Sequence, residues 1–213
     1  MDTVSVKEII KEEKLVPILR TYEKEHILNI AKAVYDSGGK IIEFTMNNKE
    51  ILDEVMKVRQ KYPDLIIGIG TVLKNEDAVA AIEHGADFIV SPILNVQLIE
   101  VVKKMNRLVI VSGFTPTEIY LGHKAGSDFV KIFPGSEVEP NYVNELRGPL
   151  PDVEFFITGG LELISAIRFL TAGASIVGMG KPLFRPEYLK EKRYDEISLL
   201  LKNAIHRIKI MEI

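Results

Sequence analysis

Two charged residues interrupt stretches that are otherwise apolar, and their types suggest carbon–carbon bond chemistry. Lys131 lies within Phe129–Phe133 and Glu43 lies within Ile41–Thr45, stretches with the composition of buried strands. Burial removes water from an ammonium group, so a lysine there needs a charged partner or a lowered pKa. A neutral amine attacks a ketone carbonyl and forms an imine. The positive nitrogen of that imine accepts electrons when a neighbouring carbon–carbon bond breaks.

The same two residues also admit a structural interpretation. Lys131 and Glu43 could form a buried ion pair, or the lysine could extend out of the strand end into water. In the catalytic interpretation, Glu43 moves protons to and from the substrate hydroxyl and the carbinolamine, directly or through water. The strand pattern by itself leaves the two interpretations of Lys131 evenly balanced.

Other polar residues stand at the ends of predicted strands. Arg20 ends the first strand, and its guanidinium matches a substrate carboxylate, although a surface arginine would look the same. Thr71 and Thr158 end the third and seventh strands. Glycines follow the last two strands, where many barrels bind phosphate through backbone N–H groups. The phosphate candidates are Gly159, Gly160, Gly178, Gly180 and the cation Lys181.

Composition argues against several other kinds of site and partner. The 213 residues include no cysteine, which excludes disulfides, thiolate metal sites and cysteine nucleophiles. The four histidines fall in helical stretches without metal-ligand spacing, so we expect no metal and no other cofactor. A net charge of −3 without a basic run argues against nucleic acid. No apolar stretch approaches the roughly 20 residues of a membrane span, so we expect a cytoplasmic protein with a small-molecule partner.

The order of the predicted elements supplies a scaffold that brings strand ends together. Eight short apolar stretches alternate with stretches of helical spacing, and their starts lie about twenty to twenty-five residues apart. Continuous apolar runs are typical of a parallel sheet that is buried on both faces. The predicted strands are Val16–Arg20, Ile41–Thr45, Leu65–Thr71, Phe88–Ser91, Leu108–Gly113, Phe129–Phe133, Glu154–Thr158 and Ser175–Gly178.

We predict that residues 1–213 form a single α/β domain, a (β/α)8 TIM barrel with an extra N-terminal helix. A doubly wound open sheet is the alternative, but such sheets rarely run through eight regular units. Met1–Lys14 and Asp195–Ile213 are predicted to be terminal helices that flank the barrel. Function in this fold belongs at the carboxyl ends of the strands, where the candidates above stand.

Glycines mark a weaker repeat at the starts of alternate strands. Gly39, Gly85, Gly126 and Gly173 each follow a predicted helix, where glycine can take the left-handed conformation that ends it. A capped helix is also predicted after the fifth strand, from Thr115-Pro-Thr-Glu118.

Seven short motifs then follow one another in a specific order. They are Ile18-Leu-Arg20, Ile42-Glu-Phe-Thr45, Gly68-Ile-Gly-Thr-Val72, Val90-Ser-Pro92, Ser112-Gly-Phe-Thr-Pro-Thr-Glu118, Val130-Lys-Ile-Phe-Pro-Gly135 and Thr158-Gly-Gly160. In this order they resemble the 2-keto-3-deoxy-6-phosphogluconate (KDPG) and 4-hydroxy-2-oxoglutarate (KHG) aldolases. The likeness extends over roughly Leu15 to Phe184, nearly the whole chain.

The resemblance implies a class I aldolase that needs no metal and assembles as a homotrimer. It implies that Lys131 forms a Schiff base with pyruvate and that Glu43 is the general acid/base. The substrate contacts it implies are Arg20, Thr71, Pro92, Phe133 and Thr158.

The sequence departs from the family pattern at two places, and both concern the substrate. Lys181 follows Gly180 where many members have a serine that contacts the sugar phosphate. Asn47 stands where some members have an arginine, and it looks closer to the branch that cleaves the phosphogalactonate. We expect cleavage of KDPG to pyruvate and glyceraldehyde 3-phosphate, or of KHG to pyruvate and glyoxylate, with 2-keto-3-deoxy-6-phosphogalactonate as the alternative substrate. A phosphosugar epimerase or isomerase and a non-catalytic phosphosugar-binding barrel are the rival functions.

Overall fold

The eight strands close into a parallel barrel, as predicted. The computed structural model describes residues 2–21 and 23–210. Each strand pairs with its neighbours in the sequence, and the ring closes through the pairing of β1 with β8. The strands are β1 (Leu15–Leu19), β2 (Ile41–Thr45), β3 (Ile66–Gly70), β4 (Phe88–Val90), β5 (Leu108–Ser112), β6 (Phe129–Ile132), β7 (Phe155–Thr158) and β8 (Ile176–Met179).

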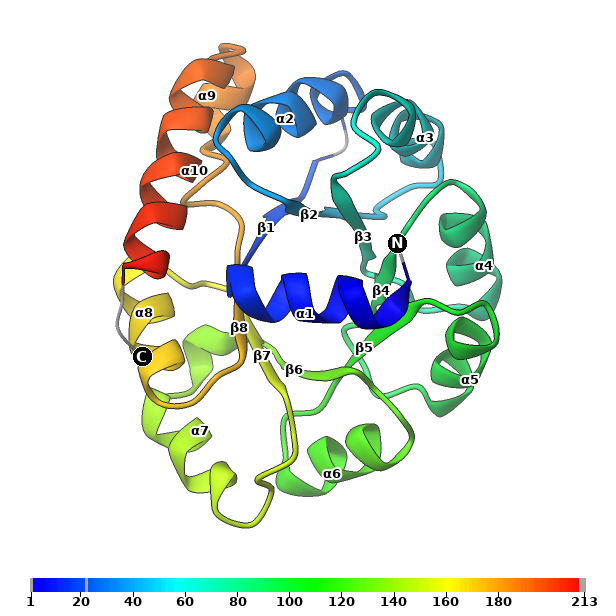
Figure 1. Ribbon diagram of the computed structural model, residues 1–213, viewed down its shortest axis with the longest axis vertical. Coiled ribbons are helices and arrows are strands. Elements are labelled where there is room, and N and C mark those ends of the chain that lie inside the picture. The colour runs from blue at the N-terminus through cyan, green and yellow to red at the C-terminus, as the bar shows by residue number, and fades with distance from the viewer. Residues whose placement is uncertain (1, 22, 211–213) are drawn as a thin grey trace.

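Helices form a ring outside the strands (Figure 1). A large apolar core of buried residues fills the space between this ring and the outward faces of the strands. Within the described ranges, no helix combines the length and the apolarity needed to cross a membrane. The helices are α1 (Thr3–Glu13), α2 (Glu25–Asp36), α3 (Ile51–Lys61), α4 (Asn75–Glu83), α5 (Val96–Lys104), α6 (Pro116–Lys124), the short 3-10 turn η1 (Gly135–Glu137), α7 (Pro140–Arg147), α8 (Leu163–Thr171), α9 (Pro186–Lys190) and α10 (Tyr194–Lys209).

Several strands end slightly earlier than predicted. Arg20, Thr71 and Phe133 were predicted as last strand residues, and they lie just after β1, β3 and β6. Thr71 has a φ of 65°, a left-handed conformation that a β-branched residue rarely adopts and that cannot continue a strand. These side chains therefore sit on the turns at the carboxyl end of the barrel.

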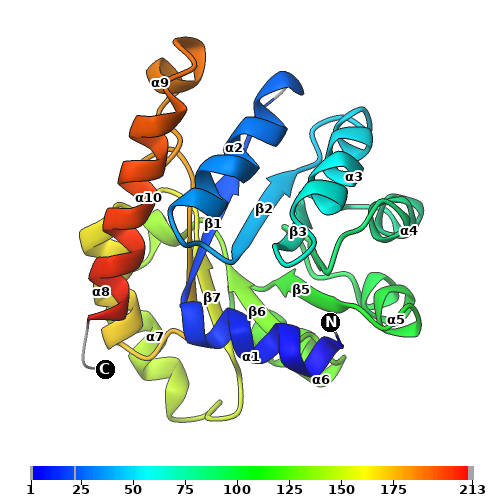
Figure 2. The same cartoon turned by 45° about the horizontal axis from the view of Figure 1, so that its top comes forward.

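The N-terminal helix lies across the amino end of the barrel, and does not flank it as predicted (Figures 1 and 2). Val6 and Ile10 of α1 pack against inward-facing residues near the strand starts, such as Val16, Ile41 and Ile66. The predicted flanking position of this helix is wrong. The apolar side chains of α1 are buried against the apolar interior of the barrel, so the helix closes the amino end. The C-terminal helix α10 belongs to the ring itself, where it lies beside α2 and contacts β1 (Figure 1). The amino end is thus filled with apolar side chains.

The glycine repeat is confirmed at three of its four positions. Gly85, Gly126 and Gly173 have φ values of 101°, 100° and 100°, and each follows the cap of a helix. At the first position the left-handed residue is Gly38, with a φ of 81°, and not Gly39. A Cβ on Gly39 would lie 2.9 Å from Val34 Cγ1, so this glycine is required by packing.

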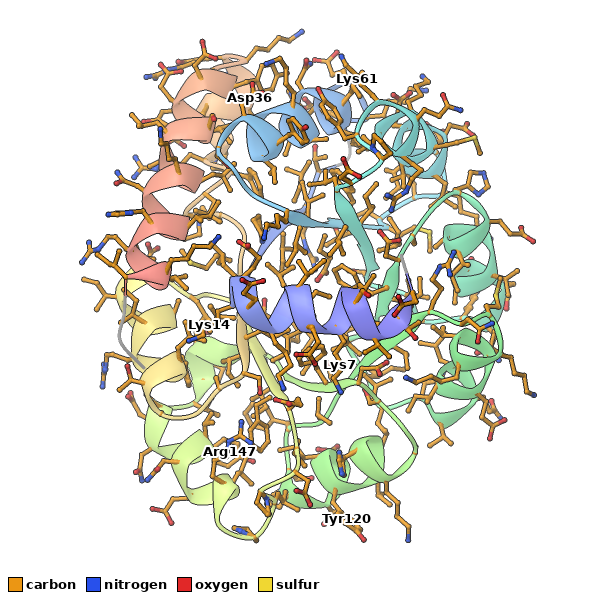
Figure 3. All side chains as sticks on the ribbon, in the orientation of Figure 1. Lys7, Lys14, Asp36, Lys61, Tyr120 and Arg147 are labelled. Atoms are coloured by element: carbon orange, nitrogen blue, oxygen red, sulfur yellow. The ribbon has the colours of Figure 1, made fainter. Side chains whose placement is uncertain are left out.

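Gly85, Gly126 and Gly173 are each followed, two residues later, by a polar side chain that accepts a hydrogen bond from the start of a neighbouring strand. Asp87 Oδ2 accepts a hydrogen bond from the Ile67 amide at 2.8 Å, and Ser175 Oγ accepts one from the Phe155 amide at 3.0 Å. Arg147, at the end of α7 (Figure 3), donates to the Gly173 carbonyl at 2.9 Å. These bonds set the register of the strands and hence the height of each inward-facing residue.

The predicted capped helix is also present. Thr115 caps α6 through its side chain, and the Glu118 carboxylate accepts a hydrogen bond from the Thr115 amide at 2.8 Å.

Candidate active site

Alternation along β2 and β6 points the two predicted catalytic residues into the barrel. Ile42 and Phe44 face the helices, so Glu43 and Thr45 face inward above Ile41. On β6, Val130 faces the helices and Lys131 faces inward above Phe129. Glu43 and Lys131 therefore stand on top of the apolar layer that fills the amino end.

A cavity of about 810 Å³ opens above this layer. Most of the residues predicted from the sequence line it, and the structure brings them together from separate strands. They are Arg20, Glu43, Thr71, Lys131, Phe133, Thr158, Gly159, Gly160, Gly180 and Lys181.

Two predicted residues, Pro92 and Gly178, do not belong to this lining. Pro92 follows β4 and is half-buried elsewhere at the carboxyl end. Gly178 lies beneath the cavity, where a Cβ would come within 2.7 Å of Thr158 Oγ1 and 2.6 Å of Ile18 Cδ1. Because Gly178 has no side chain, the Thr158 side chain can occupy the adjacent space. Gly178 therefore affects the site through packing.

Lys131 and Glu43 are buried without forming an ion pair. Their exposed fractions are 7% and 1%. Neither side chain has a salt bridge or a hydrogen bond to any of the described residues, and Glu43 Oε2 has no polar partner there. Lys131 Nζ lies 4.8 Å from the centre of the Phe133 ring. The structural interpretation of this pair is therefore not supported within the described ranges.

Burial shifts both groups toward their neutral forms. Loss of hydration lowers the pKa of Lys131 below its ordinary 10.5, opposed by the charge of Glu43 and assisted by that of Arg20. Loss of hydration raises the pKa of Glu43 above its ordinary 4.5, opposed by Lys131 and Arg20. A neutral amine is a nucleophile, and a carboxylate with a raised pKa is a stronger base than an ordinary one.

Glycine at position 70 makes room for the Glu43 side chain. Gly70 pairs with Thr45 across the two strands, and a Cβ on Gly70 would overlap Glu43 Oε1. Any larger residue at this position would displace the carboxylate from the cavity.

Three polar residues line the same cavity as the Lys131 amine. Thr158 is buried at the end of β7, and Thr71 is held on its left-handed turn after β3. Arg20 is exposed after β1, and it makes no ion pair with the described residues. A guanidinium and two hydroxyls suit a small carboxylate that is bound beside the amine.

The glycine loop and Lys181 also line the cavity. Gly159 and Gly160 have φ values of 96° and 72°, and side chains there would meet the Phe133 ring and Ser136 at 2.7 Å. Lys181 is exposed at the rim and forms no ion pair among the described residues.

Sequence reasoning missed several residues of the lining. Glu162 is the N-cap residue of α8, and its backbone amide donates a hydrogen bond to Ser165 Oγ at 2.9 Å. Thr45 also lines the cavity, and its position two residues after Glu43 on an inward face was the signal that could have found it. Asn47, singled out as a departure, lies outside the lining and donates to the Thr21 carbonyl at 3.2 Å.

Glu23 and His26 reach the rim from the start of α2. His26 is buried, with Nε2 2.6 Å from Glu23 Oε2 and Nδ1 2.9 Å from the Tyr194 hydroxyl. Glu23, Glu25 and His26 are close enough together to offer metal ligands. Both ring nitrogens of His26 are already engaged by Glu23 and Tyr194, which argues for a structural role.

Comparison with known proteins agrees with this geometry. A family model described as "KDPG and KHG aldolase" matches residues 6–200. A 2-dehydro-3-deoxy-phosphogluconate aldolase of Haemophilus influenzae is 29% identical over 209 residues, which cover 97% of this chain and 98% of that protein. A 2-dehydro-3-deoxy-6-phosphogalactonate aldolase of Escherichia coli is also 29% identical, over 190 residues that cover 88% of this chain and 93% of that protein.

Solved structures give the same result for the fold. A native KDPGal structure superimposes with a TM-score of 0.83 at 27% identity, covering 92% of this chain and 96% of that one. A KDPG aldolase of Legionella pneumophila, with pyruvate captured as a covalent carbinolamine, superimposes with a TM-score of 0.84 at 22% identity. It covers 93% of this chain and 97% of that one.

The burial of Lys131 leads to a prediction about stability. We expect Lys131→Met to raise the free energy of unfolding at about pH 7 by on the order of 1 kcal/mol, because the buried ammonium loses hydration without gaining a partner. The gain should shrink as the pH rises from the lowered pKa of Lys131 toward 10.5, because the folded wild type loses its proton before the unfolded chain does. Denaturant unfolding at several pH values measures both effects.

Lys124→Met is the matched control, because Lys124 is exposed on α6. It should change stability by less than about 0.5 kcal/mol at any of these pH values. A Lys131→Met protein that is less stable than the wild type at neutral pH would contradict the analysis.

Proposed function

We propose, from the premise that this chain belongs to the KDPG and KHG aldolase family, that it cleaves 4-hydroxy-2-oxo acids through a Schiff base on Lys131. Family membership makes the chain a class I aldolase, which is a lyase. The observation that carries the proposal is the Lys131 amine. It is buried, its pKa is lowered, and it shares a cavity with Glu43 without an ion pair between them.

In the proposed reaction, Arg20, Thr71 and Thr158 hold the substrate carboxylate end beside Lys131. The neutral amine attacks the C2 carbonyl, and loss of water from the carbinolamine gives an iminium. Glu43 takes the proton of the C4 hydroxyl, the C3–C4 electron pair moves toward the iminium, and the aldehyde leaves. The remaining enamine takes a proton at C3, and water then releases pyruvate from the lysine.

KDPG is the first choice of substrate, with pyruvate and glyceraldehyde 3-phosphate as products, and KHG is the second. The phosphogalactonate remains the alternative, because relatives named for the two sugar acids are equally similar at 29% identity. The sugar acids differ in stereochemistry, so pyruvate release from a panel that contains both, together with KHG, assigns the substrate.

The phosphate of such a substrate fits the end of the cavity near Gly159, Gly160, Gly180 and Lys181. Glu162 places a negative charge at the N-terminus of α8, and this charge opposes the binding of an anion at that helix end. We therefore assign most of the attraction for phosphate to the Lys181 ammonium.

The Schiff base is tested by reductive trapping. Pyruvate with borohydride should attach a three-carbon adduct to Lys131, which is located by mass spectrometry of peptides. Lys131→Met should give no adduct and lose cleavage, and Lys181→Met should still be labelled. An epimerase, an isomerase or a binding protein would give no adduct, and turnover that survives Lys131→Met would rule the aldolase mechanism out.

The role of Lys181 is tested by comparing two substrates. Lys181→Ala should raise the Michaelis constant for KDPG about tenfold and leave that for unphosphorylated KHG nearly unchanged, because only the first carries a phosphate for the ammonium. Lys181→Arg keeps the charge and should retain most of the affinity. Equal losses on both substrates would refute the assignment.

We also propose that the chain is a homotrimer, the state implied by its resemblance to the family. Exposed apolar side chains gather on one side of the barrel, in the loops after β3, β4 and β5 and on α5 and α6. They are Leu73, Ile93, Val96, Phe114, Tyr120 and Leu121. A patch of this kind on a protein surface marks an interaction site.

Sedimentation equilibrium should give about three times the chain mass of 23.9 kDa. Ile93→Glu should shift the protein toward the monomer, because it places a charge in the apolar patch. Val4→Glu, on an exposed position of α1 at the opposite end, should leave the trimer intact. A wild-type mass of one chain would refute the proposal.

A further inference from the structure

Two oxygen atoms inside the barrel have no hydrogen-bond partner among the described residues, and both belong to β2. They are Glu43 Oε2 and Thr45 Oγ1, on side chains that are 1% and 3% exposed. A buried hydroxyl without a partner lowers stability, so such groups in a folded protein need an explanation.

Other hydroxyls of the barrel do have partners. Ser112 Oγ, at the end of β5, donates to the Ser91 carbonyl at 3.0 Å. Ser127 Oγ, before β6, donates to the Phe129 carbonyl at 2.6 Å. Thr45 differs from these residues because its buried hydroxyl has no acceptor among the described residues, although the residue lines the cavity.

The strand places Thr45 directly above Glu43 on the way to the cavity mouth. Residues two apart on a strand point to the same face, and here that face is the interior. Thr45 pairs with Gly70, the glycine against which the Glu43 carboxylate lies. Both side chains line the cavity that contains the Lys131 amine. A substrate oxygen that reaches Glu43 from the mouth must pass beside Thr45.

We propose that Thr45 is a catalytic residue whose hydroxyl donates a hydrogen bond to the C4 oxygen of the substrate. This inference rests on the proposed function, because that oxygen is the one whose proton Glu43 takes. As the proton moves to Glu43, the C3–C4 electron pair moves to the iminium and the C4 oxygen becomes the aldehyde carbonyl. The Thr45 hydrogen bond stabilises the negative charge that develops on this oxygen. In condensation the same bond polarises the incoming aldehyde.

A purely structural role for Thr45 would require the shape of the side chain but not its hydroxyl. Valine has nearly the same shape and the same branching, so a residue that only fills space would tolerate the exchange. The hydroxyl is the feature that packing does not require. The two roles therefore separate in Thr45→Val and Thr45→Ser.

The experiment compares two reactions of the full-length enzyme. Exchange of the pyruvate methyl hydrogens with D2O, followed by NMR, needs Lys131 and proton transfer at C3 but no C4 oxygen. Cleavage of KDPG needs Lys131, proton transfer at C3 and the C4 oxygen. Thr45→Val should lower kcat for cleavage by roughly 10- to 100-fold and change exchange by less than about twofold. Thr45→Ser, which keeps the hydroxyl, should retain most of the cleavage rate.

Thermal unfolding provides the control for folding. Thr45→Val should have a Tm equal to or above that of the wild type, because it removes a buried hydroxyl without a partner. If this variant does not fold, Thr45→Ala replaces it in the comparison with Thr45→Ser.

Unchanged cleavage by Thr45→Val would overturn the proposal. Equal loss of exchange and cleavage would also overturn it, because Thr45 would then act by holding Glu43 or Lys131 in place. Failure of the proposed function looks different, since the wild type would then show neither exchange nor a trapped adduct.

Discussion

Loss of hydration at Lys131 and Glu43 is the constraint around which this barrel is arranged. An ion pair between them would hold each group in its charged form, and a charged amine cannot attack a carbonyl. The two side chains instead share a cavity without an ion pair, so loss of hydration dominates, lowering the pKa of Lys131 and raising that of Glu43. In the proposed reaction these two groups are the nucleophile and the proton carrier.

The interior of the barrel accommodates this arrangement because small and large residues occupy different levels of it. Glycines at positions 70 and 178 leave space for the side chains of Glu43 and Thr158. Below them, apolar side chains from the strands and from α1 fill the amino end. Apolar burial at the amino end and between the strands and helices stabilises the barrel, and the carboxyl end holds the polar groups that lack partners.

The sequence predicts the barrel and the central pair because both depend on local pattern. Continuous apolar runs locate β2 and β6, and a charge inside such a run is visible without a structure. Thr71 was placed inside a strand because periodicity does not encode a left-handed turn. Glu23 and His26 line the cavity from the connection after β1 and the start of α2, where no motif or interrupted apolar run marks them. Pro92 was included by resemblance alone, and it lies outside the lining.

The closure of the amino end of the barrel by α1 has a kinetic consequence. With the amino end filled, the cavity opens at the carboxyl end of the barrel, and ligands of the proposed reaction share that opening. In that reaction the keto acid fragment on Lys131 would lie deeper than the aldehyde. The aldehyde would then leave first in cleavage, and the keto acid would bind first in synthesis.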